Sequence, residues 1–248
     1  MIKPHAKAIV VLIILCAISG IARSQTTTIA VAANLKEAFA SIIAANNTLK
    51  LDEIKIIYGS SGNFTTQILN GAPFNLFISA DEQYPLELYK LGKTVDQGKI
   101  VLITNKSSGL ALMPNKEGLI EAIAKANKIA LAKPELAPYG RAAIQYLKAM
   151  GVWELAKPKL VFADNVALAS MYVKTGAADL GITALSLAQS PALTKETQYL
   201  VINDKLYEPI KQRMVLMKNP TPLAKEIYQY LQSAQAQELF IKFGYTAP

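Results

Sequence analysis

The chain has 248 residues, with 26 lysines and arginines against 18 aspartates and glutamates, for a formal net charge of +8 at pH 7. Its one cysteine, Cys16, and its one histidine, His5, both lie within the first 24 residues. Because the rest of the chain has no cysteine and no histidine, it cannot form disulfides, use a thiolate nucleophile or a Ser-His pair, or bind a metal through histidine. It also lacks a dense basic run interleaved with aromatics, which argues against a nucleic-acid partner.

Residues 1–24 have the three-part form of a secretory signal peptide. A basic start precedes an apolar run over residues 8–22, and Ala22-Arg23-Ser24 gives the small-x-small pattern of a cleavage site. The run is short for a membrane span, and the residues before Cys16 lack the small side chains of a lipoprotein site. We expect cleavage near Ser24-Gln25 and export to the periplasm, leaving 23 basic and 18 acidic residues.

The first third of the mature sequence alternates strand-like and helical patterns. Apolar, β-branched runs predict strands, and apolar residues at helical spacing predict the helices between them. Asn34 is placed to cap the first helix, and Ser60 or Ser61 the second. The predicted elements are strands over 26–34, 54–59 and 75–81, and helices over 34–47, 60–71 and 82–92.

The remaining sequence continues this alternation. Strands followed by helices of this length imply βαβ units, and hence an α/β fold with mostly parallel sheets. The predicted elements are two strand-like runs within 100–116, strands within 128–140 and over 159–165, helices over 141–151 and 166–176, a strand within 206–220, and an amphipathic helical region over 223–245.

The order of these elements suggests two lobes. One economical arrangement has the chain cross to a second lobe near residue 104 and return near 207. Lobe 1 is then 25–104 plus 208–248, and lobe 2 is 105–207. Two crossings make a hinge, with a cleft between the lobes where strand ends from both can meet.

Four predicted helices begin directly after strands, near Asn34, Ser61, Tyr139 and Val166. In open α/β sheets, ligands bind outside the carboxyl ends of the strands. The first turns of helices there present unpaired N–H groups and a partial positive charge, which suit an anion. Ordinary helix capping by serine and asparagine would produce the same pattern at any one of these places.

Several ordered segments carry a resemblance to a known family. They are "AVAANLKEAF", "YGSSGNFTTQILNGAPFNLFISAD", "PELAPYGRAAIQYLKAMGVW", "ADNVALASMYVKTGAADLGI" and "YEPIKQRMVLMKN". Over nearly all of its mature length, the chain resembles the periplasmic molybdate-binding proteins of ABC-type uptake systems. The resemblance implies a two-lobed periplasmic binding protein fold of type II. It also implies delivery of molybdate or tungstate to a membrane permease by a monomer that has no cofactor and no direct cation ligands.

Carried over by position, the oxyanion ligands would be Asn34 and Ser61 from lobe 1, with Tyr139 and Val166 from lobe 2. The later "LGITALSL" segment has Ala184 where one branch of the family has a tyrosine, so we assign no ligand role to Ala184. A tetrahedral dianion offers only acceptors, and neutral N–H and O–H donors satisfy it without burying a lysine or arginine. Whether Tyr139 offers its hydroxyl or only its backbone N–H stays open.

Other functions remain as alternatives. Sulfate is a smaller dianion, and phosphate keeps a proton at neutral pH that would need a carboxylate acceptor such as Asp164. A hydrolytic enzyme would have to use Asp81, Glu82 or Asp164, and Asp81 and Asp164 fit better as caps or turn residues. A regulator's sensor domain often has this fold, but the signal peptide and the missing DNA-binding segment argue against it. We therefore predict a transport protein and not an enzyme.

Overall fold

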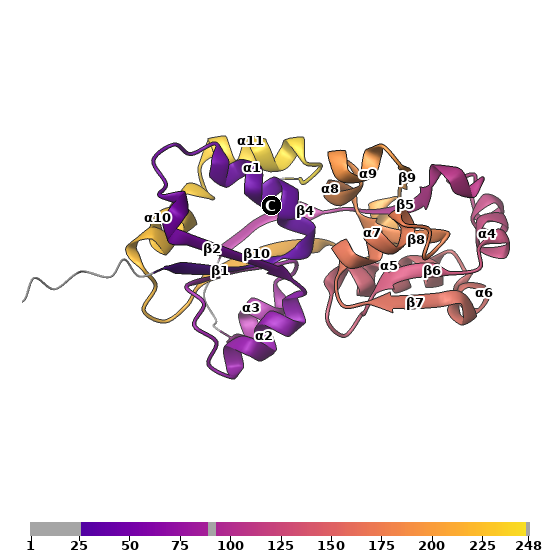
Figure 1. The fold of residues 1–248 in the computed structure, drawn as a ribbon. Coiled ribbons are helices and arrows are strands. Elements are labelled where there is room, and N and C mark those ends of the chain that lie inside the picture. Colours follow the sequence, from indigo (N-terminus) through magenta and orange to yellow (C-terminus); the bar gives the residue numbers. More distant parts are fainter. Residues whose placement is uncertain (1–25, 89–92, 247–248) are drawn as a thin grey trace, which may run out of the picture.

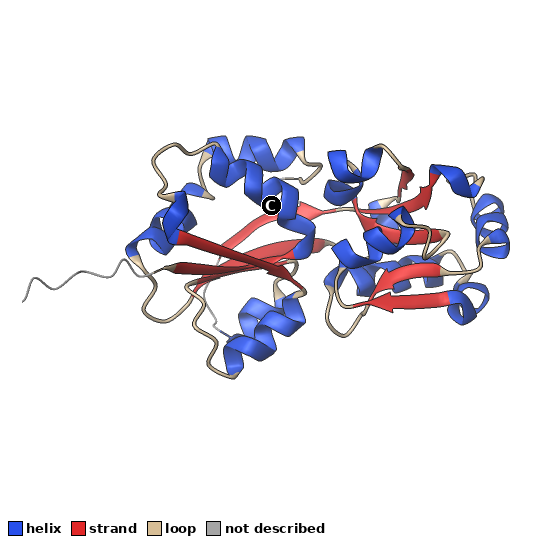
Figure 2. Cartoon of the chain, in the orientation of Figure 1, coloured by secondary structure: helices blue, strands red, loops and turns tan. Residues whose placement is uncertain are grey.

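The computed structural model describes residues 26–88 and 93–246, so the predicted signal peptide lies outside the described residues. Figure 1 shows two α/β lobes side by side, and Figure 2 shows that each contains a sheet with helices packed around it. The predicted two-lobed α/β fold is confirmed. No helix in the described ranges combines the length and the apolar character that crossing a membrane requires.

The sheet of the first lobe has the strand order β2-β1-β3-β10-β4. Strands β1, β2 and β3 are parallel, whereas β10 runs antiparallel to β3 and β4. Helices α1 and α11 lie on one side of this sheet, and α2 and α3 lie on the other (Figure 1). The bounds are β1 Thr27–Ala32, β2 Ile54–Gly59, β3 Leu76–Ser79, β4 Lys93–Gly98, β10 Ile210–Leu216, α1 Lys36–Ala44, α2 Ser61–Leu69, α3 Gln83–Leu88, α10 Pro222–Tyr230 and α11 Ala234–Lys242, with 3-10 turns η1 Ala33–Leu35 and η2 Leu51–Glu53.

The sheet of the second lobe repeats this plan in the order β7-β6-β8-β5-β9. Strands β6, β7 and β8 are parallel, and β5 runs antiparallel to β8 and β9. The alternation of strands and helices thus predicts the parallel half of each sheet, and β5 and β10 add the antiparallel pairs. The bounds are β5 Ile100–Asn105, β6 Ile129–Ala132, β7 Leu160–Ala163, β8 Leu180–Ala184, β9 Thr197–Val201, α4 Lys116–Lys125, α5 Pro138–Ala149, α6 Trp153–Ala156, α7 Val166–Lys174, α8 Leu185–Ala188 and α9 Pro191–Thr194, with 3-10 turns η3 Lys106–Ser108, η4 Lys157–Lys159 and η5 Asp204–Leu206.

The chain passes between the two sheets at two places. Strand β4 ends at Gly98 in the first sheet, and β5 begins at Ile100 in the second. The change of sheet therefore falls at Lys99, whereas the sequence suggested a crossing near 104, because the apolar run 100–104 pairs with β8 and β9. The return passes through Tyr207–Pro209 into β10, close to the predicted crossing near 207.

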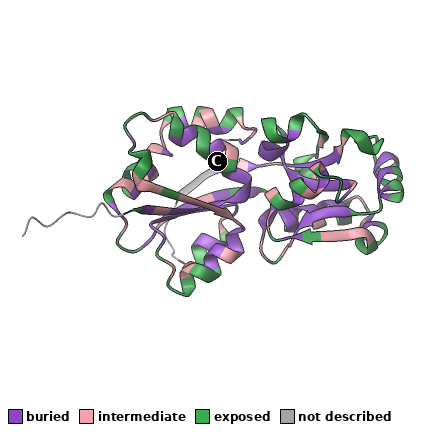
Figure 3. Cartoon of the chain, viewed as in Figure 1, coloured by how far each residue is buried: buried purple, intermediate pink, exposed green. Residues whose placement is uncertain are grey.

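Residues along the central strands are mostly buried (Figure 3). Strands β1 and β5 are almost continuously buried and apolar at four of their six positions, because helices cover both sides of each sheet. Three of the predicted elements differ from the structure. The helix predicted over 34–47 opens with the 3-10 turn η1, the region 223–245 forms two helices, and 100–116 contains one strand, β5, where two strand-like runs were expected.

Candidate functional site

The four predicted ligand residues line a single cavity between the lobes. Its volume is about 10 Å³, about that of one water-sized sphere. The residues follow the carboxyl ends of β1, β2, β6 and β7, where parallel strands deliver helix N-termini to one place. The lining residues are Ala32, Ala33, Asn34, Gly59, Ser61, Ala80, Ala137, Pro138, Tyr139, Asn165 and Val166.

Ser61 is the first residue of α2 and is 1% exposed. Its hydroxyl oxygen accepts a hydrogen bond of 2.9 Å from the backbone N–H of Ala80. Because that bond uses the oxygen as an acceptor, the hydroxyl hydrogen remains free to donate into the cavity. The N-cap residue is Ser60, whose side chain makes no capping bond, so neither serine caps α2 through its hydroxyl.

Val166 begins α7 and offers only backbone donors. Asn165 caps this helix by accepting from the N–H of Leu168, at 2.9 Å. The N–H groups of a helix's first turn have no partner within the helix, so the Val166 N–H is available beside the cavity. Val166 itself is buried.

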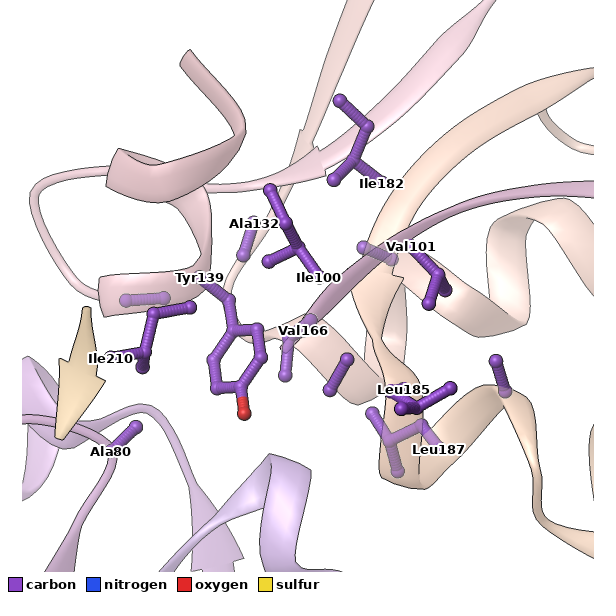
Figure 4. Close-up of a cluster of buried hydrophobic side chains, with 14 of the residues drawn as sticks. Ala80, Ile100, Val101, Ala132, Tyr139, Val166, Ile182, Leu185, Leu187 and Ile210 are labelled. Atoms are coloured by element: carbon purple, nitrogen blue, oxygen red, sulfur yellow. The ribbon is translucent and has the colours of Figure 1, made fainter. Parts of the chain in front are cut away.

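Tyr139 lies in the first turn of α5, directly after Pro138. Its ring packs among buried apolar side chains such as Ile100 and Ile210, and its hydroxyl points away from Ala132 (Figure 4). The hydroxyl oxygen lies against Gly98, only 2.0 Å from where a Cβ at that position would stand. Since Gly98 does not line the cavity, the backbone N–H is the donor that Tyr139 can offer to a ligand there.

Asn34 lies in η1, not at the N-cap of α1, so it does not cap that helix as its position in the sequence suggested. Its side-chain nitrogen donates to Gln212 Oε1 at 3.0 Å and to the Tyr245 hydroxyl at 2.9 Å. Both side-chain N–H hydrogens are therefore used inside the protein. The backbone N–H is what Asn34 has left to offer to the cavity.

No side chain that lines the cavity carries a charge. Asp164 is an exposed residue that pairs with Lys133 at 2.7 Å and does not line the cavity. Asp81 pairs with Arg141 and accepts from the N–H of Tyr84, as expected of a capping residue. Burial nevertheless raises the pKa of Asp81, against the lowering effects of the Tyr84 N–H and of Arg141.

The third acid named from the sequence, Glu82, pairs with Arg213 at 3.4 Å. Ala184 is buried at the end of β8 and does not line the cavity. Within the described ranges, no group of three or more acidic, histidine or cysteine residues is placed to hold a metal ion. The cavity is therefore a neutral site rich in donors, without a carboxylate or a metal-binding cluster.

The two lobes touch at the edge of this cavity. The Gly62 N–H donates to the Leu136 carbonyl at 2.9 Å, and the Tyr84 hydroxyl donates to the Glu135 carbonyl at 2.8 Å. A side chain at Gly62 would meet the Leu136 backbone at 3.0 Å, so this close approach needs a glycine. Together with the Asp81–Arg141 pair, these bonds join the two lobes beside the cavity.

The sequence did not identify the small residues that shape the walls, such as Gly59, Ala80 and Ala137. Their common feature is that each lies at the end of a strand or between a strand and the helix that follows it. A small side chain leaves space beside the helix N-termini, but small residues are too common in loops for this feature to be a usable signal. Ala80 also contributes the N–H that orients the Ser61 hydroxyl.

Comparisons with known proteins agree on one family. The family model for bacterial extracellular solute-binding proteins matches residues 27–246. The chain is 34% identical to the molybdate-binding protein ModA of Azotobacter vinelandii, over 90% of this chain and 91% of that protein. It is also 34% identical to ModA of Rhodobacter capsulatus, over 87% and 86% of the two chains.

Among solved structures, the periplasmic molybdate-binding protein of A. vinelandii matches with a TM-score of 0.78 and 28% identity, covering 90% of this chain and 99% of that one. A sulfate-binding protein, SubI from Mycobacterium tuberculosis, matches with a TM-score of 0.69 at 15% identity, over 89% and 86% of the two chains, and so shares the fold alone. The chain belongs to the bacterial extracellular solute-binding proteins.

Proposed function

We propose that this protein binds molybdate, and tungstate equally, in the cavity between its lobes and delivers the anion to an ABC transporter. The observation that carries the proposal is the donor set of the cavity. Ser61 offers a hydroxyl hydrogen, and the backbone N–H groups of Asn34, Tyr139 and Val166 stand at or beside helix starts. Two α/β lobes that meet around this set supply donors from both sides.

The absence of charge in the cavity favours a fully deprotonated ligand. A dianion accepts hydrogen bonds at every oxygen, and fixed N–H and O–H dipoles stabilise it without the desolvation cost of a buried lysine or arginine. Phosphate keeps a proton at neutral pH, which would face an N–H donor instead of an acceptor. Asp164, the acceptor that a phosphate reading needs, lies outside the lining and is bound to Lys133.

Selection against sulfate then depends on size. Sulfate has the same charge and shape as molybdate but shorter bonds to oxygen. Donors fixed on four separate elements would not reach its oxygens together. The similarity to a sulfate-binding protein, at 15% identity, supports only the common fold. The relatives that share 34% identity carry the name molybdate-binding protein, which favours the larger anion.

Transport also accounts for the remaining features. Export to the periplasm follows from the predicted signal peptide over residues 1–24, and a membrane permease would receive the anion from the closed, monomeric protein. The chain passes from one sheet to the other at Lys99 and at Tyr207–Pro209, and the two lobes would open and close about these crossings. Family membership among solute-binding proteins supports this role in place of an enzymatic one.

Ligand-dependent stability tests the proposal directly. A ligand that binds only the folded chain raises the free energy of unfolding by about 2.7 kcal/mol when its concentration is about 100 times its dissociation constant. We expect molybdate to raise the melting temperature of the mature protein and native mass spectrometry to show one anion per chain. A melting temperature that stays constant in molybdate up to millimolar concentrations would contradict the proposal.

A further inference from the structure

Behind the anion cavity, six polar side chains form a buried cluster that joins the two lobes. Four belong to the first lobe and two to the second, and each has at most 3% of its surface exposed. We refer to them as the hinge cluster, because Asp96 and Gln212 lie on β4 and β10, the strands that lead to and from the crossings. The members are Asn34, Asp96, Tyr139, Ser186, Gln212 and Tyr245.

Hydrogen bonds within the hinge cluster hold Asn34 from several sides. The side-chain nitrogen of Asn34 donates to Gln212 and to Tyr245. Its backbone carbonyl accepts from the Ser186 hydroxyl, at 2.8 Å, across the boundary between the lobes. The Tyr245 hydroxyl lies 2.9 Å from both that carbonyl and the Ser186 oxygen. The backbone of Asn34 at the anion cavity is therefore positioned by side chains on its far side.

The hinge cluster also contains buried polar atoms with no hydrogen-bond partner among the described residues. They are Asn34 Oδ1, both carboxyl oxygens of Asp96, the Tyr139 hydroxyl and Gln212 Nε2. Such atoms are rare in native proteins, and five in one cluster need an explanation. The Tyr139 hydroxyl and Gln212 Nε2 lie 2.0 and 3.2 Å from where a Cβ at Gly98 would stand, and the Tyr245 hydroxyl interacts with both side chains.

Asp96 is the ionisable member of this cluster that matters at neutral pH. Burial raises its pKa well above the usual value for an aspartate, and no cation contributes to the shift. The titratable groups that face it are the phenols of Tyr139 and Tyr245, with Tyr207 beside Tyr139, and the pKa of each phenol is raised by burial. An isolated buried carboxylate is costly, so burial favours the neutral acid form of Asp96, which has one O–H donor. Asp96 is paired across β4 and β10 with Gln212, the residue that accepts a hydrogen bond from the Asn34 side chain.

We propose that the hinge cluster positions the anion-binding amides, with Asp96 as its central positioning residue. Asn34 and Tyr139 each present a backbone N–H to the cavity and send their side chain into the cluster, so the two amides share one support. Ser186 and Tyr139 from the second lobe meet Asn34, Asp96 and Gln212 from the first, so the support forms only when the lobes are closed. This inference rests on the proposed oxyanion site and adds the residues that hold its geometry.

Three variants of the full mature protein test the inference. Asp96→Asn keeps the shape, the neutrality and a donor, so molybdate affinity should stay within twofold of wild type. Asp96→Leu and Tyr139→Phe remove the polar group but keep the bulk, and should weaken molybdate binding about tenfold, as loss of outer hydrogen-bond partners does at other ion sites. Because a buried carboxyl replaced by an apolar side chain of similar volume often gains stability, Asp96→Leu should melt no lower than wild type.

Measuring both affinity and stability distinguishes a role of the hinge cluster in positioning the amides from a role in folding alone. Weaker binding in a variant that is as stable as wild type, with recovery in Asp96→Asn, supports the inference. Affinities within twofold of wild type in both Asp96→Leu and Tyr139→Phe would overturn it. If wild type itself failed to bind molybdate, the proposed function would fail first. The infrared band of a protonated carboxylic acid, present at neutral pH in wild type and lost in Asp96→Asn, tests the cluster without any ligand, and its absence from wild type would overturn the inference.

Discussion

The hydroxyl of Ser61 is a buried side-chain donor with its hydrogen free to point into the cavity, so Ser61→Ala is a sharp single substitution. The change removes a hydrogen bond to a charged ligand, which is worth about 1.5–3 kcal/mol. Molybdate affinity should therefore fall about 10- to 150-fold. The same change leaves the buried N–H of Ala80 without its 2.9 Å acceptor, which should lower the free energy of unfolding by about 1–3 kcal/mol.

Ser60→Ala provides a matched control for this experiment. Ser60 is the adjacent residue, is 4% exposed, and carries a hydroxyl that has no hydrogen-bond partner among the described residues and lies outside the cavity lining. Isothermal titration with molybdate measures the affinities, and urea unfolding without ligand measures the stabilities. Ser60→Ala should leave molybdate affinity unchanged and should not lower the free energy of unfolding. Equal molybdate affinity in Ser61→Ala and wild type would refute the assignment of Ser61 as a ligand.

Three further predictions concern the lobes and the hinge. Arg141→Gln breaks the ion pair between Arg141 and Asp81, in which the two side chains are 34% and 12% exposed. It should weaken binding by releasing molybdate faster, as stopped-flow measurements would show. An unchanged release rate would show that the pair does not hold the lobes closed. Lys159 donates to three carbonyls at the end of α4, so Lys159→Met should lower the free energy of unfolding in urea by about 1–2 kcal/mol and leave molybdate affinity unchanged. The raised pKa of Asp96 means that the folded state binds its proton more tightly than the unfolded state does. Wild type should therefore lose stability relative to Asp96→Asn as the pH rises above about 4, by up to about 1.4 kcal/mol per pH unit until the folded-state pKa is passed, and parallel stability curves for the two proteins would contradict the buried neutral acid.

Local patterns in the sequence were sufficient for the strand–helix units. Strand β2 has the predicted bounds, 54–59, and α7 begins at the predicted residue, Val166, because buried runs and helix starts are local signals. The change of sheet at Lys99 was not predictable in the same way. Residues on both sides of Lys99 belong to strands, and only long-range pairing of β5 with β8 and β9 decides which sheet takes the run from Ile100.

The candidate site was predictable in its backbone but not in its side chains. Asn34, Ser61, Tyr139 and Val166 meet at one cavity because parallel strands deliver their carboxyl ends to the same edge. The use of Asn34 and Tyr139 side chains in the hinge cluster depends on Gln212 and other residues far away in the sequence. No local pattern records such contacts. A side chain that the sequence suggests as a cap or a ligand can therefore point away from the cavity, while the backbone of the same residue faces it.

The central claim, a neutral cavity of fixed donors that selects a large dianion, is tested most directly by one competition titration. Molybdate bound to the mature protein is challenged with tungstate, sulfate and phosphate in parallel at pH 6, 7 and 8. The lining carries no group expected to titrate in this range, so molybdate affinity should stay nearly constant, tungstate should compete about equally, and sulfate and phosphate should compete weakly at every pH. Displacement of molybdate by millimolar phosphate, stronger at pH 6 than at pH 8, would reveal an acceptor in the site and contradict the account.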